Sequence, residues 1–116
     1  MGQTVLVVDD EQNIVNIIAF NLKKEGYEVL TAGDGEEAVE IVEKHQPDLI
    51  LLDIMMPKMD GYTATREIRT LSSNKKANIP IVAMTANAFE EDRQKAFKAG
   101  MNAHIAKPID VNILMG

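Results

Sequence analysis

Short apolar runs alternate with longer amphipathic segments along the whole of this 116-residue chain, and that alternation leaves few folds open to it. The stretch before Gly26 is typical of the longer segments, because Val15, Ile18 and Leu22 recur at the spacing of one helix face. Parallel strands need such helical crossovers, so we predict an α/β fold with helices on both faces of a parallel sheet. The five predicted strands lie at 5–8, 27–32, 49–52, 81–84 and 103–106.

The composition of these runs predicts their order in the sheet. The runs at 5–8, 49–52 and 81–84 are uniformly apolar, as expected of strands that are buried on both sides. The second and fifth runs are more polar and are better suited to the edges. A doubly wound sheet with the order 2-1-3-4-5 places those two strands at its edges. We therefore predict that fold class for this chain.

Length, charge and cysteine content narrow the class of protein. A chain of 116 residues is the usual size of one domain, so we expect a single domain over 1–116. The net charge of −6 argues against a surface that follows nucleic-acid phosphates or anionic lipids. No apolar run reaches membrane-spanning length, and the absence of cysteine fits a reducing compartment. We expect a soluble, cytoplasmic protein with neither a nucleic acid nor a membrane as its partner.

Reactive side chains stand at the carboxyl ends of four of the five predicted strands. Asp9 and Asp10 end the first strand and Asp53 the third, and Thr85 and Lys107 follow the fourth and fifth. In open α/β sheets the ligand site lies beyond these ends. Three carboxylates gathered there would repel one another unless a cation neutralised them. Oxygen ligands without cysteine favour Mg²⁺, with Mn²⁺ as the alternative.

The same residues predict phosphoryl transfer to a carboxylate. Asp53 is placed at the centre of the sheet, where a carboxylate nucleophile can form an acyl phosphate. Asp9 and Asp10 would hold the metal. The Lys107 ammonium and the Thr85 hydroxyl would both contact phosphoryl oxygens, because this chemistry depends mostly on positioning and charge neutralisation.

Four separated motifs contain these residues. They are Val-Leu-Val-Val-Asp-Asp-Glu at 5–11, Leu-Ile-Leu-Leu-Asp-Ile-Met-Met-Pro at 49–57 with Asp60-Gly61, Met84-Thr85-Ala86, and Ala106-Lys107-Pro108. Together they closely resemble the receiver domains of response regulators in two-component signalling. The resemblance runs from Thr4 to about Leu114, and its specificity lies in the combination of the four motifs.

The resemblance implies a flavodoxin-like receiver fold and a phosphoacceptor role. It implies that Asp53 is phosphorylated by the phosphohistidine of a histidine kinase or phosphotransfer protein, or by a small phosphodonor, in a reaction that requires Mg²⁺. It further implies that the Met55 backbone carbonyl completes the metal ligands and that a cis peptide precedes Pro108. The domain would then not be an enzyme with a separate substrate. It would be a phosphoprotein of a phosphorelay that assists its own phosphorylation and dephosphorylation.

The resemblance also implies a switch that changes a binding surface for an output partner not identified by the sequence. Thr85 would move toward the phosphoryl group, and the residue at position 104 would follow it. Family members usually have Tyr or Phe where this chain has His104, so a plain edge-strand histidine is an equal alternative. The fifth helix of the family has barely begun at Gly116, so we expect a truncated last helix. The motif at 84–89 is typical of receivers in hybrid histidine kinases, and a stand-alone regulator is the alternative.

Other functions and simpler structural roles stay open at this point. A flavodoxin-like electron carrier would need a phosphate-binding loop where this chain has Asp9, Asp10 and Glu11. A Mg²⁺-dependent aspartyl phosphatase would typically carry its nucleophile on the first strand. A receiver-like interaction module that is never phosphorylated is a third alternative. Singly, Asp9 or Asp10 could cap the first helix and Asp60 the third.

Overall fold

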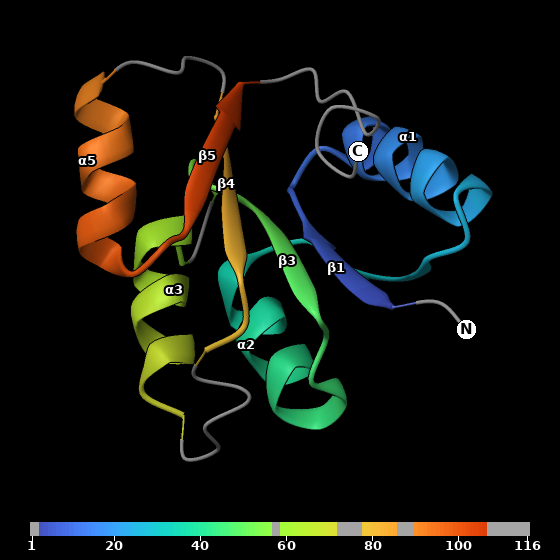
Figure 1. The fold of residues 1–116 in the computed structure, drawn as a ribbon, viewed down its shortest axis with the longest axis horizontal. Coiled ribbons are helices and arrows are strands. Elements are labelled where there is room, and N and C mark those ends of the chain that lie inside the picture. Colours follow the sequence, from blue (N-terminus) through green and yellow to red (C-terminus); the bar gives the residue numbers. More distant parts are fainter. Residues whose placement is uncertain (1–2, 57–58, 72–77, 86–89, 107–116) are drawn as a thin grey trace.

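The computed structural model of the chain describes residues 3–56, 59–71, 78–85 and 90–106. Within these ranges the chain forms one five-stranded sheet with helices on both faces (Figure 1). The elements in chain order are β1 (Thr4–Val8), α1 (Gln12–Lys24), β2 (Glu28–Ala32), α2 (Gly35–His45), β3 (Leu49–Asp53), α3 (Gly61–Arg69), β4 (Ile81–Thr85), α5 (Glu90–Ala99) and β5 (Ala103–Ala106).

The sheet has the strand order β2-β1-β3-β4-β5, and each neighbouring pair is parallel. The predicted order is therefore confirmed. β1, β3 and β4 are buried along almost their whole length, whereas every side chain of β2 except that of Ala32 is exposed or half-buried. The polarity of the runs could predict this order because an edge strand meets solvent on one side.

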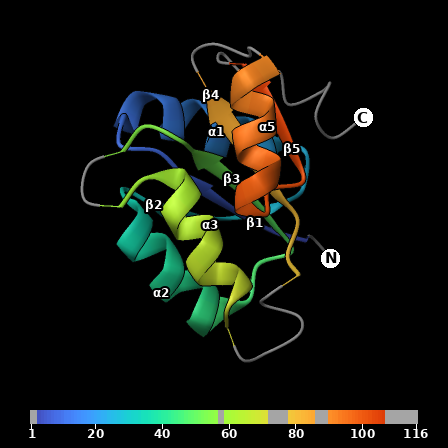
Figure 2. The ribbon, with the colours of Figure 1, turned by 90° about the vertical axis from the view of Figure 1, so that its left-hand side faces the viewer.

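Alternate side chains of the strands enter two separate cores. Leu6 and Val8 of β1 belong to the core beneath α2, α3 and α5, which lie side by side in front of the sheet in Figure 2. Val5 and Val7 belong to the other core, where they pack with Leu22 of α1. The predicted covering of both faces is confirmed, and the carboxyl ends of the strands come out between the two layers.

Asp53 and Thr85 are the last residues of their strands rather than the first residues beyond them. The strands extend this far because Asp53 is in register with Met84 of β4, and Thr85 with Ala106 of β5. Both side chains are thus carried on regular strand backbone. Rigid elements of this kind hold a reactive group more closely than a loop does.

Three expectations fall on 107–116, outside the described residues. They are the position of Lys107, the cis peptide before Pro108 and the truncated last helix. Among the helices that the structure describes, none has both the length and the apolar character needed to span a bilayer.

Candidate functional site

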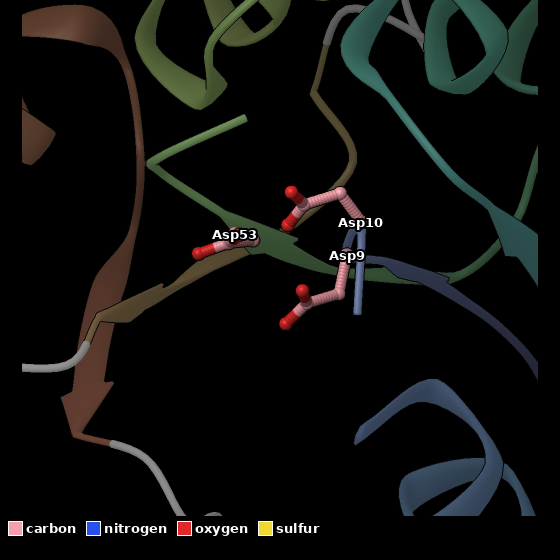
Figure 3. A group of neighbouring side chains, drawn as sticks. All are labelled: Asp9, Asp10 and Asp53. Atoms are coloured by element: carbon pink, nitrogen blue, oxygen red, sulfur yellow. The ribbon is translucent and has the colours of Figure 1, made fainter. Parts of the chain in front are cut away.

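Three carboxylates from two neighbouring strands meet at the carboxyl edge of the sheet (Figure 3). Asp9 follows the last residue of β1, and Asp53 ends β3 beside it, because Val8 and Leu52 are partners in the parallel register. Asp10 comes next along the chain. One oxygen from each side chain lies within 4.8 Å of the other two. The structure therefore brings together the three acids that the sequence placed at strand ends.

The three acids differ in their exposure to water. Only 2% of Asp9 and 4% of Asp53 is exposed, whereas Asp10 is exposed. The Oδ1 atom of Asp9 accepts a hydrogen bond of 2.9 Å from the backbone N–H of Glu11, which orients that carboxylate. Buried negative charges so close together are unfavourable without compensation. A hard divalent cation prefers oxygen ligands of this kind, so the donor set fits Mg²⁺ or Mn²⁺.

The backbone of Asp53 is held from both sides of its strand. β1 pairs with β3 up to Leu52, and β4 pairs with Asp53 itself through Met84. The ladder continues one residue further, because the Ile54 N–H donates to the Met84 carbonyl over 3.2 Å. At the edge, the Asp9 N–H donates to the carbonyl of Ala32 in β2 over 3.2 Å. Four adjacent strands thus fix the backbone from which the acids project.

Thr85 lies at the same edge of the sheet as the acids. It follows Met84, the partner of Asp53, and its side chain is half-buried. Its register partner, Ala106, is the residue before Lys107, which lies outside the described residues. The topology therefore places the Thr85 hydroxyl on the strand next to Asp53, as a role in contacting a phosphoryl group requires.

His104 and Met55 have contrasting surroundings. His104 is half-buried on β5 opposite Ala83, and its Nε2 atom is buried without a hydrogen-bond partner among the described residues. His104 is not among the residues that could hold a metal ion together with the three acids. Met55 comes two residues after Asp53, and 80% of its side chain is exposed.

The capping roles considered from the sequence have different outcomes. Asp60 does cap α3, because its Oδ1 atom accepts a 2.8 Å hydrogen bond from the Thr63 N–H. At α1 the N-cap position is taken by Glu11, and no side-chain cap bond forms there. Helix capping therefore explains the presence of Asp60 but not that of Asp9 or Asp10.

Gly61 is part of a motif in the sequence, but its contact with Asp53 was not predictable from that motif. Gly61 begins α3 and lies directly against the backbone of Asp53 and Ile54. The signal in the sequence was a glycine at the first position of a helix, right after the capping residue. Such a glycine often marks a close approach between two stretches of backbone.

Comparison with known proteins decides which family this site belongs to. The sequence model of the response regulator receiver domain matches residues 5–116. The chain belongs to that family. Chemotaxis protein CheY4 of Vibrio cholerae is 31% identical with a TM-score of 0.91, and the match covers 99% of this chain and 94% of that one. The flavodoxin-like carrier and the phosphatase are not supported by these matches.

Two further structures are similar to this receiver domain. The receiver domain of sensor histidine kinase PA1611 from Pseudomonas aeruginosa, which has a magnesium ion coordinated in its active-site cleft, is 40% identical with a TM-score of 0.87 over 99% of this chain and 93% of that one. The N-terminal domain of a response regulator receiver protein from Methanoculleus marisnigri is 34% identical with a TM-score of 0.81, over 97% of this chain and 90% of that one. Receivers of kinases and of regulators therefore share this fold.

Proposed function

We propose that this receiver domain is a signalling switch in which Asp53 accepts a phosphoryl group with the help of a divalent cation. The observation that carries the proposal is the meeting of three carboxylates within 4.8 Å at the carboxyl edge of the sheet. Two of them are almost fully buried, so their mutual repulsion is poorly screened by water. Membership of the receiver family and the magnesium ion in the related kinase receiver support the same assignment.

The three acids would hold Mg²⁺ at the edge of the sheet that the phosphoryl donor would approach. Asp9, Asp10 and Asp53 would supply carboxylate oxygens, and the backbone carbonyl of Met55 would complete the protein ligands. Mn²⁺ has similar preferences and would bind to the same oxygens. When bound, the cation would neutralise charge on the acids and on the phosphoryl oxygens.

In the proposed reaction, a carboxylate oxygen of Asp53 attacks the phosphorus of a phosphohistidine. The new O–P bond forms as the N–P bond breaks, and the released imidazole of the donor takes up a proton. The Thr85 hydroxyl would donate a hydrogen bond to one phosphoryl oxygen, and the Lys107 ammonium group would contact another. Asp53 itself becomes the product, so we regard the domain as a phosphoacceptor rather than an enzyme with turnover.

The donor would be a histidine kinase or a phosphotransfer protein in the cytoplasm. Phosphorylation would move the Thr85 hydroxyl, and His104 on the neighbouring strand would respond to that movement. The altered surface would then bind an output partner. The similarity to both kinase receivers and regulators is compatible with either setting for this domain.

Intact-mass measurement after treatment with acetyl phosphate and Mg²⁺ tests the proposal. We expect the unaltered chain to gain one phosphoryl group and Asp53→Asn to gain none. Asp48→Asn is a matched control, because Asp48 precedes the opposite end of β3, where its carboxylate accepts the backbone N–H of Thr4 over 2.8 Å. Equal gain by Asp53→Asn, or no gain by the unaltered chain with either acetyl phosphate or a phosphorylated phosphotransfer protein, would overturn the proposal.

A further inference from the structure

Gly61 brings the start of α3 into direct contact with the backbone of the proposed phosphoacceptor. A Cβ atom at this position would lie 2.5 Å from the carbonyl oxygen of Asp53 and 2.9 Å from the Cα atom of Ile54. It would also lie 3.2 Å from the carbonyl carbon of Asp53. All three neighbours are main-chain atoms at the end of the central strand, so they cannot turn aside as a flexible side chain could. Even the smallest side chain at position 61 must displace one backbone or the other.

Hydrogen bonds hold Gly61 in this position. Its N–H donates to the Ile54 carbonyl over 2.9 Å, and its carbonyl accepts from the buried Thr65 hydroxyl over 2.8 Å. The cap formed by Asp60 fixes the same turn of the helix. The first turn of α3 is therefore hydrogen-bonded to the Ile54–Met55 peptide, directly after Asp53, and held by groups inside the helix.

This contact acts on Asp53 from outside the plane of the sheet. Strand pairing with Met84 fixes the Asp53 backbone within the sheet, but it constrains movement toward the face less strongly. α3 covers that face, and Gly61 is its first residue. The position of the Asp53 carboxylate relative to those of Asp9 and Asp10 thus depends on how closely α3 approaches.

We propose that Gly61 is a positioning residue for Asp53, and that its missing side chain lets α3 set the distance between the Asp53 carboxylate and the other two acids. The inference rests on the proposed function, because its consequence is measured as cation binding. A shift of the Asp53 backbone that relieves these contacts would move its carboxylate relative to those of Asp9 and Asp10. We expect Gly61→Ala to weaken Mn²⁺ binding by about tenfold or more, because ligand geometry controls affinity at such sites.

The test is a Mn²⁺ titration of the full chain, followed by electron paramagnetic resonance of the free ion. Gly33→Ala is the matched control, because a Cβ atom there would approach no described residue more closely than Glu37 Oε1, at an ordinary 3.8 Å. Ile68→Val is the stability control, since it removes one buried methylene from α3 far from the acids. We expect both controls to bind Mn²⁺ within about twofold of the unaltered chain. Unchanged affinity in Gly61→Ala would overturn the inference.

Thr65 provides a second test should Gly61→Ala not fold, which circular dichroism will reveal. Thr65→Val removes the hydroxyl that holds the Gly61 carbonyl, and Thr65→Ser keeps it. We expect Mn²⁺ affinity to be about threefold lower in the valine variant than in the serine variant, in line with the loss of one modest hydrogen bond. Equal affinities would overturn the inference. Absence of Mn²⁺ binding by the unaltered chain would instead overturn the proposed function, and the inference with it.

Discussion

Asp9 and Asp53 occupy positions where charged side chains are rarely found. They are 2% and 4% exposed, and Asp10 brings a third carboxylate within 4.8 Å of them. Three negative charges that lie close together and are partly buried repel one another, so we expect this cluster to lower the stability of the fold when no cation is bound. The same repulsion is what a divalent cation relieves. At the scale of single residues, we therefore expect one arrangement to have two results, a lower stability of the unliganded fold and an affinity for a divalent cation.

Asp10→Asn should change the stability of the unliganded fold and the affinity for Mg²⁺ in opposite directions. Loss of one of three neighbouring charges should raise the melting temperature in the presence of a chelator by about 2 to 4 °C, because like-charge repulsion falls. The same change should weaken Mg²⁺ binding by about tenfold, because it removes a charged ligand. Calorimetry can measure both quantities. Glu11→Gln is the control, because it removes the adjacent charge from a side chain outside the cluster. A variant that melts lower and binds equally well would contradict this prediction.

His104→Phe tests the cost of the buried Nε2 atom. Phenylalanine keeps a planar ring at this half-buried position and removes the nitrogen that lacks a partner among the described residues. The free energy of unfolding in urea should rise by about 1 kcal/mol, the usual penalty of one unsatisfied polar atom. The exposed His45 is the control, and His45→Gln should change stability by less than about 0.5 kcal/mol. A lower stability in His104→Phe would show that the nitrogen is satisfied in solution.

The acids of the site could be predicted from the sequence, but the groups that support them could not. Asp9, Asp10 and Asp53 each follow an apolar run, and parallel strands bring their ends to one edge. The closeness of Gly61 to Asp53 depends on the separation of a helix and a strand, which no local pattern encodes. The burial of Asp9 beside the exposed Asp10 likewise depends on how the whole edge is covered.

At the scale of elements, Arg69 ties the end of α3 to two other parts of the fold. Its Nε and Nη2 atoms donate to the Gly100 carbonyl over 2.9 and 2.7 Å, and Nη1 donates to the Ile79 carbonyl over 2.7 Å. Nη2 also donates to Asn102 Oδ1 over 2.8 Å, and that oxygen accepts from the Ile81 N–H over 2.9 Å. Burial lowers the pKa of the Arg69 guanidinium by removing water, and the acceptors replace that water.

Arg69→Lys should destabilise the fold by about 2 kcal/mol, because an ammonium group cannot reach acceptors in three directions as a planar guanidinium does. Urea denaturation measures the change. Arg66→Lys, on the exposed side of the same helix, should be nearly neutral and serves as the control. Mn²⁺ affinity should be unaltered in both variants, because the hydrogen bonds that hold Gly61 at the other end of α3 stay in place. Equal stabilities of the two variants would contradict the anchoring role of Arg69.

Sheet order was predictable at this scale, and the tie made by Arg69 was not. Uniformly apolar runs identified β1, β3 and β4 as interior strands because both of their faces are covered. Arg69 sits in the polar last turn of α3, where a cation is equally common on a fully solvated surface. Only the folded arrangement shows that the turn between α5 and β5 and the residue Ile79 before β4 supply its acceptors.

At the scale of the whole molecule, the acids should link cation concentration to the stability of the fold. A ligand that binds only the native state at 100 times its Kd stabilises it by about 2.7 kcal/mol. For a chain of this size, such a gain should raise the melting temperature by about 10 °C. A thermal melt in Mg²⁺ against one in KCl of equal ionic strength measures the effect. Asp53→Asn should show a clearly smaller rise, and an equal rise in both chains would place the stabilising ion elsewhere.

The contacts of Arg69 and the acidic cluster lie at opposite ends of the sheet. Ile79 and Ile81 stand where β4 begins, whereas Asp53 stands where β3 ends. Substitutions that are well separated in a fold usually combine additively. Mutant libraries randomised around these two ends could therefore be screened independently and then merged. Substitutions that change cation binding at one end of the sheet and substitutions that raise stability at the other could then be selected in separate rounds of directed evolution.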